Sequence, residues 1–129
     1  MKQLYIADDN SDFALFLKTV AERDGWSVVV CANGRELLDQ VQLAQGAALL
    51  LVDINMPELD GIQAVEGLAG VDRPLRIRFM TGGADTSIMA AKMIARARSL
   101  SVGRNIFKPV TKDRLLSILA DEATLLADG

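Results

Sequence analysis

The sequence contains no histidine and a single cysteine, Cys31. Without histidine, the chain itself cannot supply a histidine-based catalytic triad, a histidine zinc site or a phosphohistidine. With one cysteine, it cannot form an internal disulfide or a cysteine metal cluster. A reducing, cytoplasmic setting fits this composition best.

Long apolar runs and strongly basic stretches are also missing. The longest apolar run, Ala47–Val52, is too short to cross a bilayer, and the N-terminus lacks the apolar core of a signal peptide. Acidic and basic residues are mixed along the chain, and the formal net charge is −3. Nothing resembles the basic surface of a nucleic-acid-binding protein. We therefore expect no membrane segment and no direct nucleic-acid partner.

Five short apolar runs alternate with longer amphipathic stretches along the 129 residues, a length typical of one domain. The runs are Gln3–Ala7, Trp26–Cys31, Ala48–Val52, Leu75–Met80 and Val102–Phe107. The first three are nearly continuous and rich in branched or aromatic residues, as buried parallel strands are. The pattern predicts one domain over residues 1–129, with a doubly wound α/β fold and a five-stranded parallel sheet.

The stretches between the runs carry the spacing of helices. Phe13, Phe16, Leu17 and Val20 fall on one helical face, and Gly25 follows as a stop signal. The predicted helices begin at Asn10 or Ser11, at Asn33, at Asp60, near Asp85 and near Thr111. The fourth helix is expected to end near Ser99, and the fifth near Ala127.

Polar residues follow four of the five predicted strands. Asp8 and Asp9 follow the first strand, Asp53 the third, Thr81 the fourth and Lys108 the fifth. Taken singly, each has a commoner structural explanation as a turn residue, a helix cap or a surface lysine. Because the carboxyl ends of parallel strands meet at one edge of such a sheet, where ligands bind, their joint occurrence favours a functional site.

These residue types support a specific chemistry. Three clustered carboxylates repel one another and suit Mg²⁺, whereas Ca²⁺ would need more protein oxygens. A lysine and a threonine hydroxyl suit the oxygens of a phosphoryl group, and a carboxylate can attack phosphorus to form an aspartyl-phosphate.

The motifs IADDN, LVDINMPELDG, MTGG and FKP occur in this order. Together they resemble the receiver domain of two-component response regulators, and the resemblance covers essentially the whole chain. It implies a flavodoxin-like sheet of order 2-1-3-4-5 and phosphorylation on Asp53. It also implies an Mg²⁺ site formed by Asp8, Asp9, Asp53 and the backbone carbonyl of Asn55, with Asp9 as a direct ligand and Asp8 acting largely through water. Thr81 and Lys108 would then contact the phosphoryl oxygens.

The same resemblance implies a signalling module and not an enzyme. A histidine kinase or a histidine phosphotransfer protein would donate the phosphoryl group. Phosphorylation would then control binding of a downstream protein through the surface of the fourth helix, fifth strand and fifth helix. Whether this surface also forms a homodimer stays open.

The sequence departs from the family pattern in two places on the output side. Asn105 stands three residues before Lys108, where the family usually carries a tyrosine or phenylalanine that switches rotamer. The stretch from Thr81 to Lys108 is also several residues longer than usual. We therefore expect the coupling between Thr81 and the output surface to use a different element.

Arg76 and Arg78 lie on a predicted interior strand, where both faces are normally apolar. In one interpretation, both sit near the strand start and reach solvent along their aliphatic stems. In the other, the altered fourth-helix region supplies an acidic partner for Arg78. The sequence does not decide between them.

Two other functions were weighed against a phosphorylated receiver. A receiver-fold interaction domain that works without phosphate is supported by the missing aromatic at Asn105. The complete set of aspartates argues against it. A small phosphohydrolase with an aspartate nucleophile would want an acid two residues after Asp53, where Asn55 stands.

Overall fold

The computed structural model describes residues 2–54, 61–82, 92, 95–96 and 100–128. Its strands are β1 (Gln3–Ala7), β2 (Ser27–Cys31), β3 (Ala48–Asp53), β4 (Leu75–Thr81), β5 (Ser101–Val102) and β6 (Ile106–Phe107). Its helices are α1 (Ser11–Arg23), α2 (Gly34–Val41), α3 (Gly61–Leu68) and α5 (Lys112–Asp128). Residues 92, 95 and 96, within the predicted fourth helix, are also helical.

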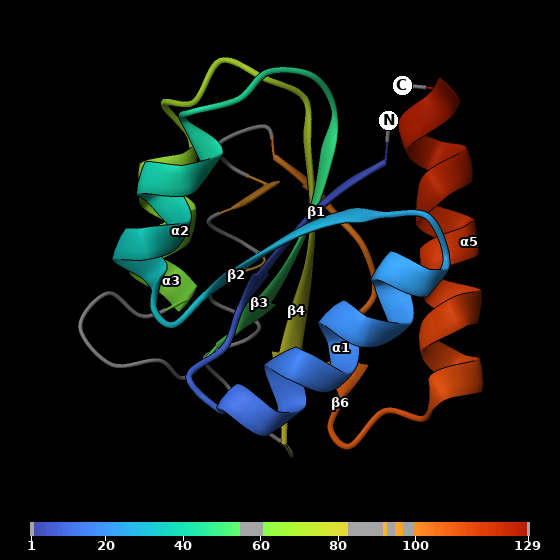
Figure 1. Ribbon diagram of the computed structural model, residues 1–129. Helices are drawn as coiled ribbons and strands as arrows, with labels where there is room; N and C mark the ends of the chain where they lie inside the picture. Colours follow the sequence, from blue (N-terminus) through green and yellow to red (C-terminus); the bar gives the residue numbers. More distant parts are fainter. Residues whose placement is uncertain (1, 55–60, 83–91, 93–94, 97–99, 129) are drawn as a thin grey trace.

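The strands form one parallel sheet in the order β2-β1-β3-β4-β5, and β6 also pairs with β4. This confirms the predicted α/β fold and the strand order 2-1-3-4-5. Figure 1 shows α1 and α5 on one face of the sheet and α2 and α3 on the other. Such crossovers place the carboxyl ends of all strands at the same edge of the sheet.

The alternation of side chains along the strands divides the core into two layers. Leu49 and Leu51 of β3 pack with α1 and α5, whereas Leu50 and Val52 pack with α2 and α3. All four are fully buried. Because strand side chains point to opposite faces in turn, a strand covered on both sides must be apolar throughout. This explains the unbroken run that ends at Asp53.

Side-chain caps fix the start of three helices. The side chain of Asn10 accepts a hydrogen bond from the Phe13 backbone N–H, and Asn33 accepts one from that of Glu36. Thr111 Oγ1 accepts one from the Arg114 backbone N–H at the start of α5. Each cap satisfies a backbone donor that the first turn leaves unpaired. The predicted cap at Asp60 lies outside the described residues.

The predicted fifth strand is interrupted, which corrects the sequence-based boundary. Val102 pairs with Ile77 and Ile106 pairs with Met80, so three residues, 103–105, lie opposite two residues of β4. This surplus residue is a bulge. Backbone hydrogen bonds hold both sides of it, from Gly103 N–H to the Ile77 carbonyl and from Lys108 N–H to the Thr81 carbonyl, each 2.8 Å long.

The arginines of β4 pair with a buried carboxylate. Arg76 Nε lies 2.6 Å from Glu122 Oε2, and Arg78 Nε lies 2.6 Å from Glu122 Oε1. Glu122 is fully buried and Arg78 is 7% exposed. The interpretation that both arginines reach solvent is therefore wrong for Arg78. The expectation of an acidic partner is right, but the partner comes from α5, because Arg76 and Arg78 share the sheet face that α5 covers.

Candidate functional site

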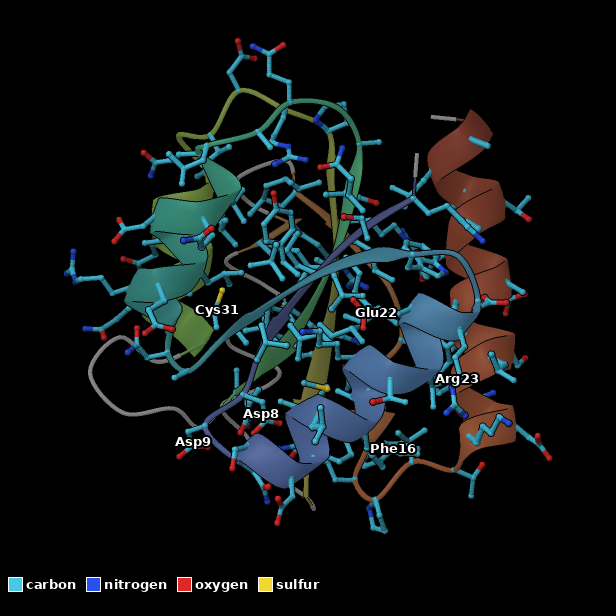
Figure 2. All side chains as sticks on the ribbon, viewed as in Figure 1. Asp8, Asp9, Phe16, Glu22, Arg23 and Cys31 are labelled. Carbon is cyan, nitrogen blue, oxygen red and sulfur yellow. The ribbon has the colours of Figure 1, made fainter. Side chains whose placement is uncertain are left out.

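The predicted site residues do gather at the carboxyl edge of the sheet. Asp8 and Asp9 follow β1 and lead into α1, as Figure 2 shows. Asp53 ends β3, Thr81 ends β4 and Lys108 follows β6. Strand order brings them together, because β3 lies between β1 and β4 in the sheet.

Three carboxylates form the acidic cluster, which we define as Asp8, Asp9 and Asp53. One oxygen from each lies within 4.8 Å of the other two. Asp8 and Asp53 are buried, while Asp9 is exposed. Like charges this close repel one another strongly when they are shielded from water. The donor set, three carboxylates open to solvent on one side, fits a hard divalent cation.

Lys108 is the cation that balances part of this charge. Its Nζ lies 2.6 Å from Asp8 Oδ2 and 3.1 Å from Asp53 Oδ2, and 5.0 Å from the centre of the Phe13 ring. Burial alone would lower the pKa of Lys108, but hydrogen bonds and charge from Asp8, and then from Asp53, outweigh it. The pKa of Lys108 is therefore raised, and the ammonium stays charged.

Local structure fixes the side chain of Asp8. The Asp8 side chain is inaccessible to solvent, and its Oδ1 accepts a hydrogen bond of 2.9 Å from the Asn10 backbone N–H. Its own backbone N–H donates to the Cys31 carbonyl of the neighbouring strand. Asp8 thus closes the turn from β1 into α1 and also anchors Lys108.

Thr81 lies on the same edge of the sheet and is buried. Its backbone carbonyl accepts the hydrogen bond from Lys108 N–H, so the end of β4 and the lysine are held together. Asn55, the predicted fourth metal ligand, lies outside the described residues. Its predicted role therefore stays a prediction.

Two features of the charged residues were not predicted from the sequence. The shortest contact of Lys108 is with Asp8 and not with Asp53. The buried position of Glu122 was also missed, although the sequence carries a signal for it. Glu122 lies seven residues after Leu115 and three after Leu119, on the spacing of the buried face of α5.

Among the residues that the structure describes, every helix falls short of the length and apolar character that a bilayer crossing requires.

Comparison with known proteins shows which proteins this chain is similar to. A family model described as the response regulator receiver domain matches residues 4–120. The response regulator receiver protein CpdR of Brucella abortus (strain 2308) is 35% identical over 88 residues, which cover 68% of this chain and 72% of CpdR. The chain also matches longer sensor proteins, of which it spans less than a fifth.

Solved structures show the same fold. A CheY-like receiver domain protein from Methanospirillum hungatei JF-1 has a TM-score of 0.81 at 18% identity, covering 99% of this chain and 98% of the other. The receiver domain of sensor histidine kinase PA1611 from Pseudomonas aeruginosa PAO1 has a TM-score of 0.73 at 16% identity, covering 93% and 95%. That structure has a magnesium ion coordinated in its active site cleft.

Proposed function

The chain belongs to the response regulator receiver domain family and serves as a phosphoacceptor module in two-component signalling, and we propose that Asp53 is the residue that accepts the phosphoryl group. The observation that carries this assignment is the different access of the three carboxylates. Asp8 is sealed and holds Lys108, and Asp9 is exposed. The Asp53 side chain is 10% accessible and still lies 3.1 Å from the ammonium.

The proposed step is an attack by an Asp53 oxygen on phosphorus. A phosphorus–oxygen bond forms while the bond from phosphorus to a nitrogen of the donor's histidine breaks. The electron pair leaves with that imidazole, which takes up a proton. Lys108 then exchanges its contact with the Asp53 carboxylate for a phosphoryl oxygen, and its raised pKa keeps it protonated for this role.

Mg²⁺ is the proposed cofactor, held by Asp9, Asp53 and the backbone carbonyl of Asn55, with Asp8 acting largely through water. When bound, it supplies positive charge that stabilises the transferring phosphoryl oxygens. Three carboxylates and one ammonium leave the site with a formal charge of −2. A dication would neutralise this charge, which supports the proposal.

A phosphoryl group on Asp53 adds about −1.5 to −2 charges at pH 7 and three acceptor oxygens. Thr81 and Lys108 are the side chains at this edge that can turn toward it. Lys108 N–H is already hydrogen-bonded to the Thr81 carbonyl, so a shift of one displaces the other. We propose that this movement alters the surface of the fourth helix, β5, β6 and α5, which a downstream protein reads.

A histidine kinase or a histidine phosphotransfer protein is the proposed phosphodonor, because this chain has no histidine of its own. The free thiol of Cys31 fits a cytoplasmic setting, which belongs to the same proposal. A homodimer through the output surface is a further option that the test below addresses. The chain is proposed to signal, not to turn over a phosphate ester as an enzyme.

Incubation with acetyl phosphate and Mg²⁺, followed by intact mass measurement, tests the acceptor. We expect one phosphoryl adduct on the wild type and on Asp39→Ala, a control on the exposed face of α2. We expect none on Asp53→Ala. An adduct that persists in Asp53→Ala would overturn the assignment of Asp53, and sustained release of phosphate over many turnovers would instead indicate a phosphohydrolase.

A second measurement separates a phosphate-dependent module from a constitutive interaction domain. We expect beryllofluoride, a phosphoryl mimic, to change the partners captured from a cell extract or the sedimentation of the chain. Identical capture and sedimentation with and without the mimic would favour an interaction domain that works without phosphate. That is the alternative suggested by Asn105.

A further inference from the structure

A second charged site lies beside β4 and α5, away from the acidic cluster. It is a hollow of about 550 Å³, and we call it the cationic hollow. Its basic side chains come from β4, the predicted fourth helix, the bulge and α5: Arg76, Arg78, Lys92, Arg96, Arg104 and Arg114. Asp121 is the acidic residue that lines it among the described residues.

The charge of the cationic hollow is far from balanced. It holds six of the chain's fourteen lysines and arginines, although the chain as a whole has a net charge of −3. The nearby carboxylate of Glu122 is already paired with Arg76 and Arg78. Burial, and then the positive charges of Arg96 and Arg78, lower the pKa of Lys92, as expected where cations crowd together.

The arginines keep donors for a ligand. A guanidinium group carries five N–H donors. Among the residues that the structure describes, the contacts are Nε of Arg76 and of Arg78 with Glu122, and Nη1 of Arg76 with Ser101 Oγ. Glu122 therefore fixes the two arginines in place through one edge of each group. A preorganised guanidinium binds phosphate oxygens in a bidentate manner.

The cationic hollow also has an apolar wall, made of Val102, Ile118 and Leu125. Leu125 is 46% exposed, so a ligand can contact this part of the wall, whereas Ile118 is buried. The volume lies within the range of small-molecule sites, roughly 300–1,000 Å³. Inorganic phosphate alone would leave the wall uncovered, whereas a phosphate joined to a flat, largely apolar ring system would occupy both parts.

From this arrangement we propose that the cationic hollow binds a phosphate-bearing small molecule of the nucleotide class. The cations converge from four segments onto one compact space, which suits clustered phosphate charge. An acidic peptide spreads its carboxylates along the chain, at roughly 3.3 Å per residue when extended, and fits this convergence less well.

The site is separate from the acidic cluster. Asp53 pairs with Met80 in the sheet, and Arg76 lies four residues earlier on the same strand. Four residues of strand span roughly 13 Å. Nucleotide binding here should therefore need neither Mg²⁺ nor phosphorylation of Asp53. It can be tested independently of the proposed role of Asp53.

Isothermal titration of the full chain with ATP, in EDTA and at fixed ionic strength, tests the proposal. We expect ATP to bind the wild type and Asp53→Asn equally, and to bind Arg104→Ala/Arg114→Ala roughly tenfold more weakly or worse. Both arginines are exposed, so this variant keeps the fold. The matched control is Arg23→Ala/Arg35→Ala, which removes the same charge from α1 and α2 and should bind ATP as the wild type does.

Two further probes define the ligand class. Pyrophosphate should bind more weakly than ATP because it cannot cover the apolar wall, and adenosine should not bind because it carries no phosphate. The proposal is overturned if ATP binds the Arg104/Arg114 variant as tightly as the wild type, or if binding is lost in Asp53→Asn. It is also overturned if pyrophosphate matches ATP, or if a polyglutamate peptide binds and ATP does not.

Discussion

Two clusters of charge on the same sheet are built in opposite ways. The acidic cluster at the carboxyl edge holds three carboxylates against one lysine, and one of its members faces solvent. The arginine–glutamate cluster, Arg76, Arg78 and Glu122, surrounds one sealed carboxylate with two guanidinium groups. One therefore has a surplus of negative charge, and the other a surplus of positive charge.

The two clusters differ in whether their charges stabilise the fold or serve chemistry. Both Glu122 oxygens have a guanidinium partner, so the chain itself completes this carboxylate. The acidic cluster keeps a charge of −2 that its own lysine does not cancel. Removing a carboxylate should therefore destabilise the arginine–glutamate cluster. In the acidic cluster, it should instead reduce the repulsion between like charges. Three measurements test this contrast.

The largest expected effect follows from Glu122→Gln. It leaves two cations beside a neutral amide, and removing one partner of a buried ion pair typically costs about 3–5 kcal/mol. This is a large share of the roughly 5–15 kcal/mol that stabilises a domain. Urea unfolding at neutral pH measures the change.

Asp121→Asn is the matched control, because Asp121 is adjacent and exposed. Its effect should stay within about 0.5 kcal/mol. If Glu122→Gln fails to fold, the triple variant Arg76→Leu/Arg78→Met/Glu122→Leu decides the matter, because it removes all three charges and should regain most of the stability. Equal losses from Glu122→Gln and Asp121→Asn would remove the contrast between the clusters.

Mg²⁺ should produce the next largest effect, and only through the acidic cluster. At a hundred times its dissociation constant, it should raise the free energy of unfolding of the wild type by about 2.7 kcal/mol. Asp9→Asn should lose most of this gain. Without Mg²⁺, the same variant should be no less stable than the wild type, since it removes one of three repelling carboxylates.

Thermal unfolding with and without MgCl₂ reports both quantities. Asp12→Asn, an exposed position in the first turn of α1, serves as the control and should respond to Mg²⁺ as the wild type does. An undiminished Mg²⁺ gain in Asp9→Asn would place the ion elsewhere.

The smallest expected effect is a change in stability at alkaline pH that depends on Lys108. Its pKa is raised in the folded state above the ordinary 10.5, so its stabilising contribution is complete below that value. The contribution is lost as pH rises through the folded pKa. Lys108→Arg keeps its charge throughout this range, because a guanidinium does not titrate there. Stability should therefore fall less steeply in the variant as the pH rises above about 10.5.

Two other effects drop out when the change of stability with pH is compared between the wild type and Lys108→Arg. A packing cost of the larger arginine is independent of pH, and Cys31, whose pKa burial raises to about 12, is present in both proteins. Parallel urea-unfolding slopes across this pH range would show that the pairing of Lys108 with the carboxylates contributes little.

Local chemistry made the strands and the acidic cluster predictable. Asp53 could be placed because an unbroken apolar run predicts a strand covered on both faces, whose end meets the other strand ends. Asn10 and Asn33 could be placed as caps because an N-cap depends on backbone groups a few residues away. Such features require only the sequence near them and the strand order.

The pairing of Glu122 was harder to predict because it depends on distant parts of the chain. Arg78 and Glu122 are 44 residues apart, and only the packing of α5 on a particular sheet face brings them together. Nothing near Arg78 in the sequence indicates α5 and not the fourth helix as the source of its partner. The interruption of the fifth strand was missed for a similar reason, since register is set by the partner strand.

That interruption has a consequence for how the chain can change length. In a strand, adding or removing one residue exchanges which side chains point to each face. The surplus residue among 103–105 is what sets Ile106, and not Asn105, opposite Met80 in the core. With Gly103 or Arg104 deleted, two residues would stand opposite Arg78 and Phe79, so Ile106 would keep its place opposite Met80 in an unbroken strand and Asn105 would lie opposite the buried Phe79. The bulge and the polar Asn105 are therefore expected to be gained or lost together, because an unbroken strand would place Asn105 against the core.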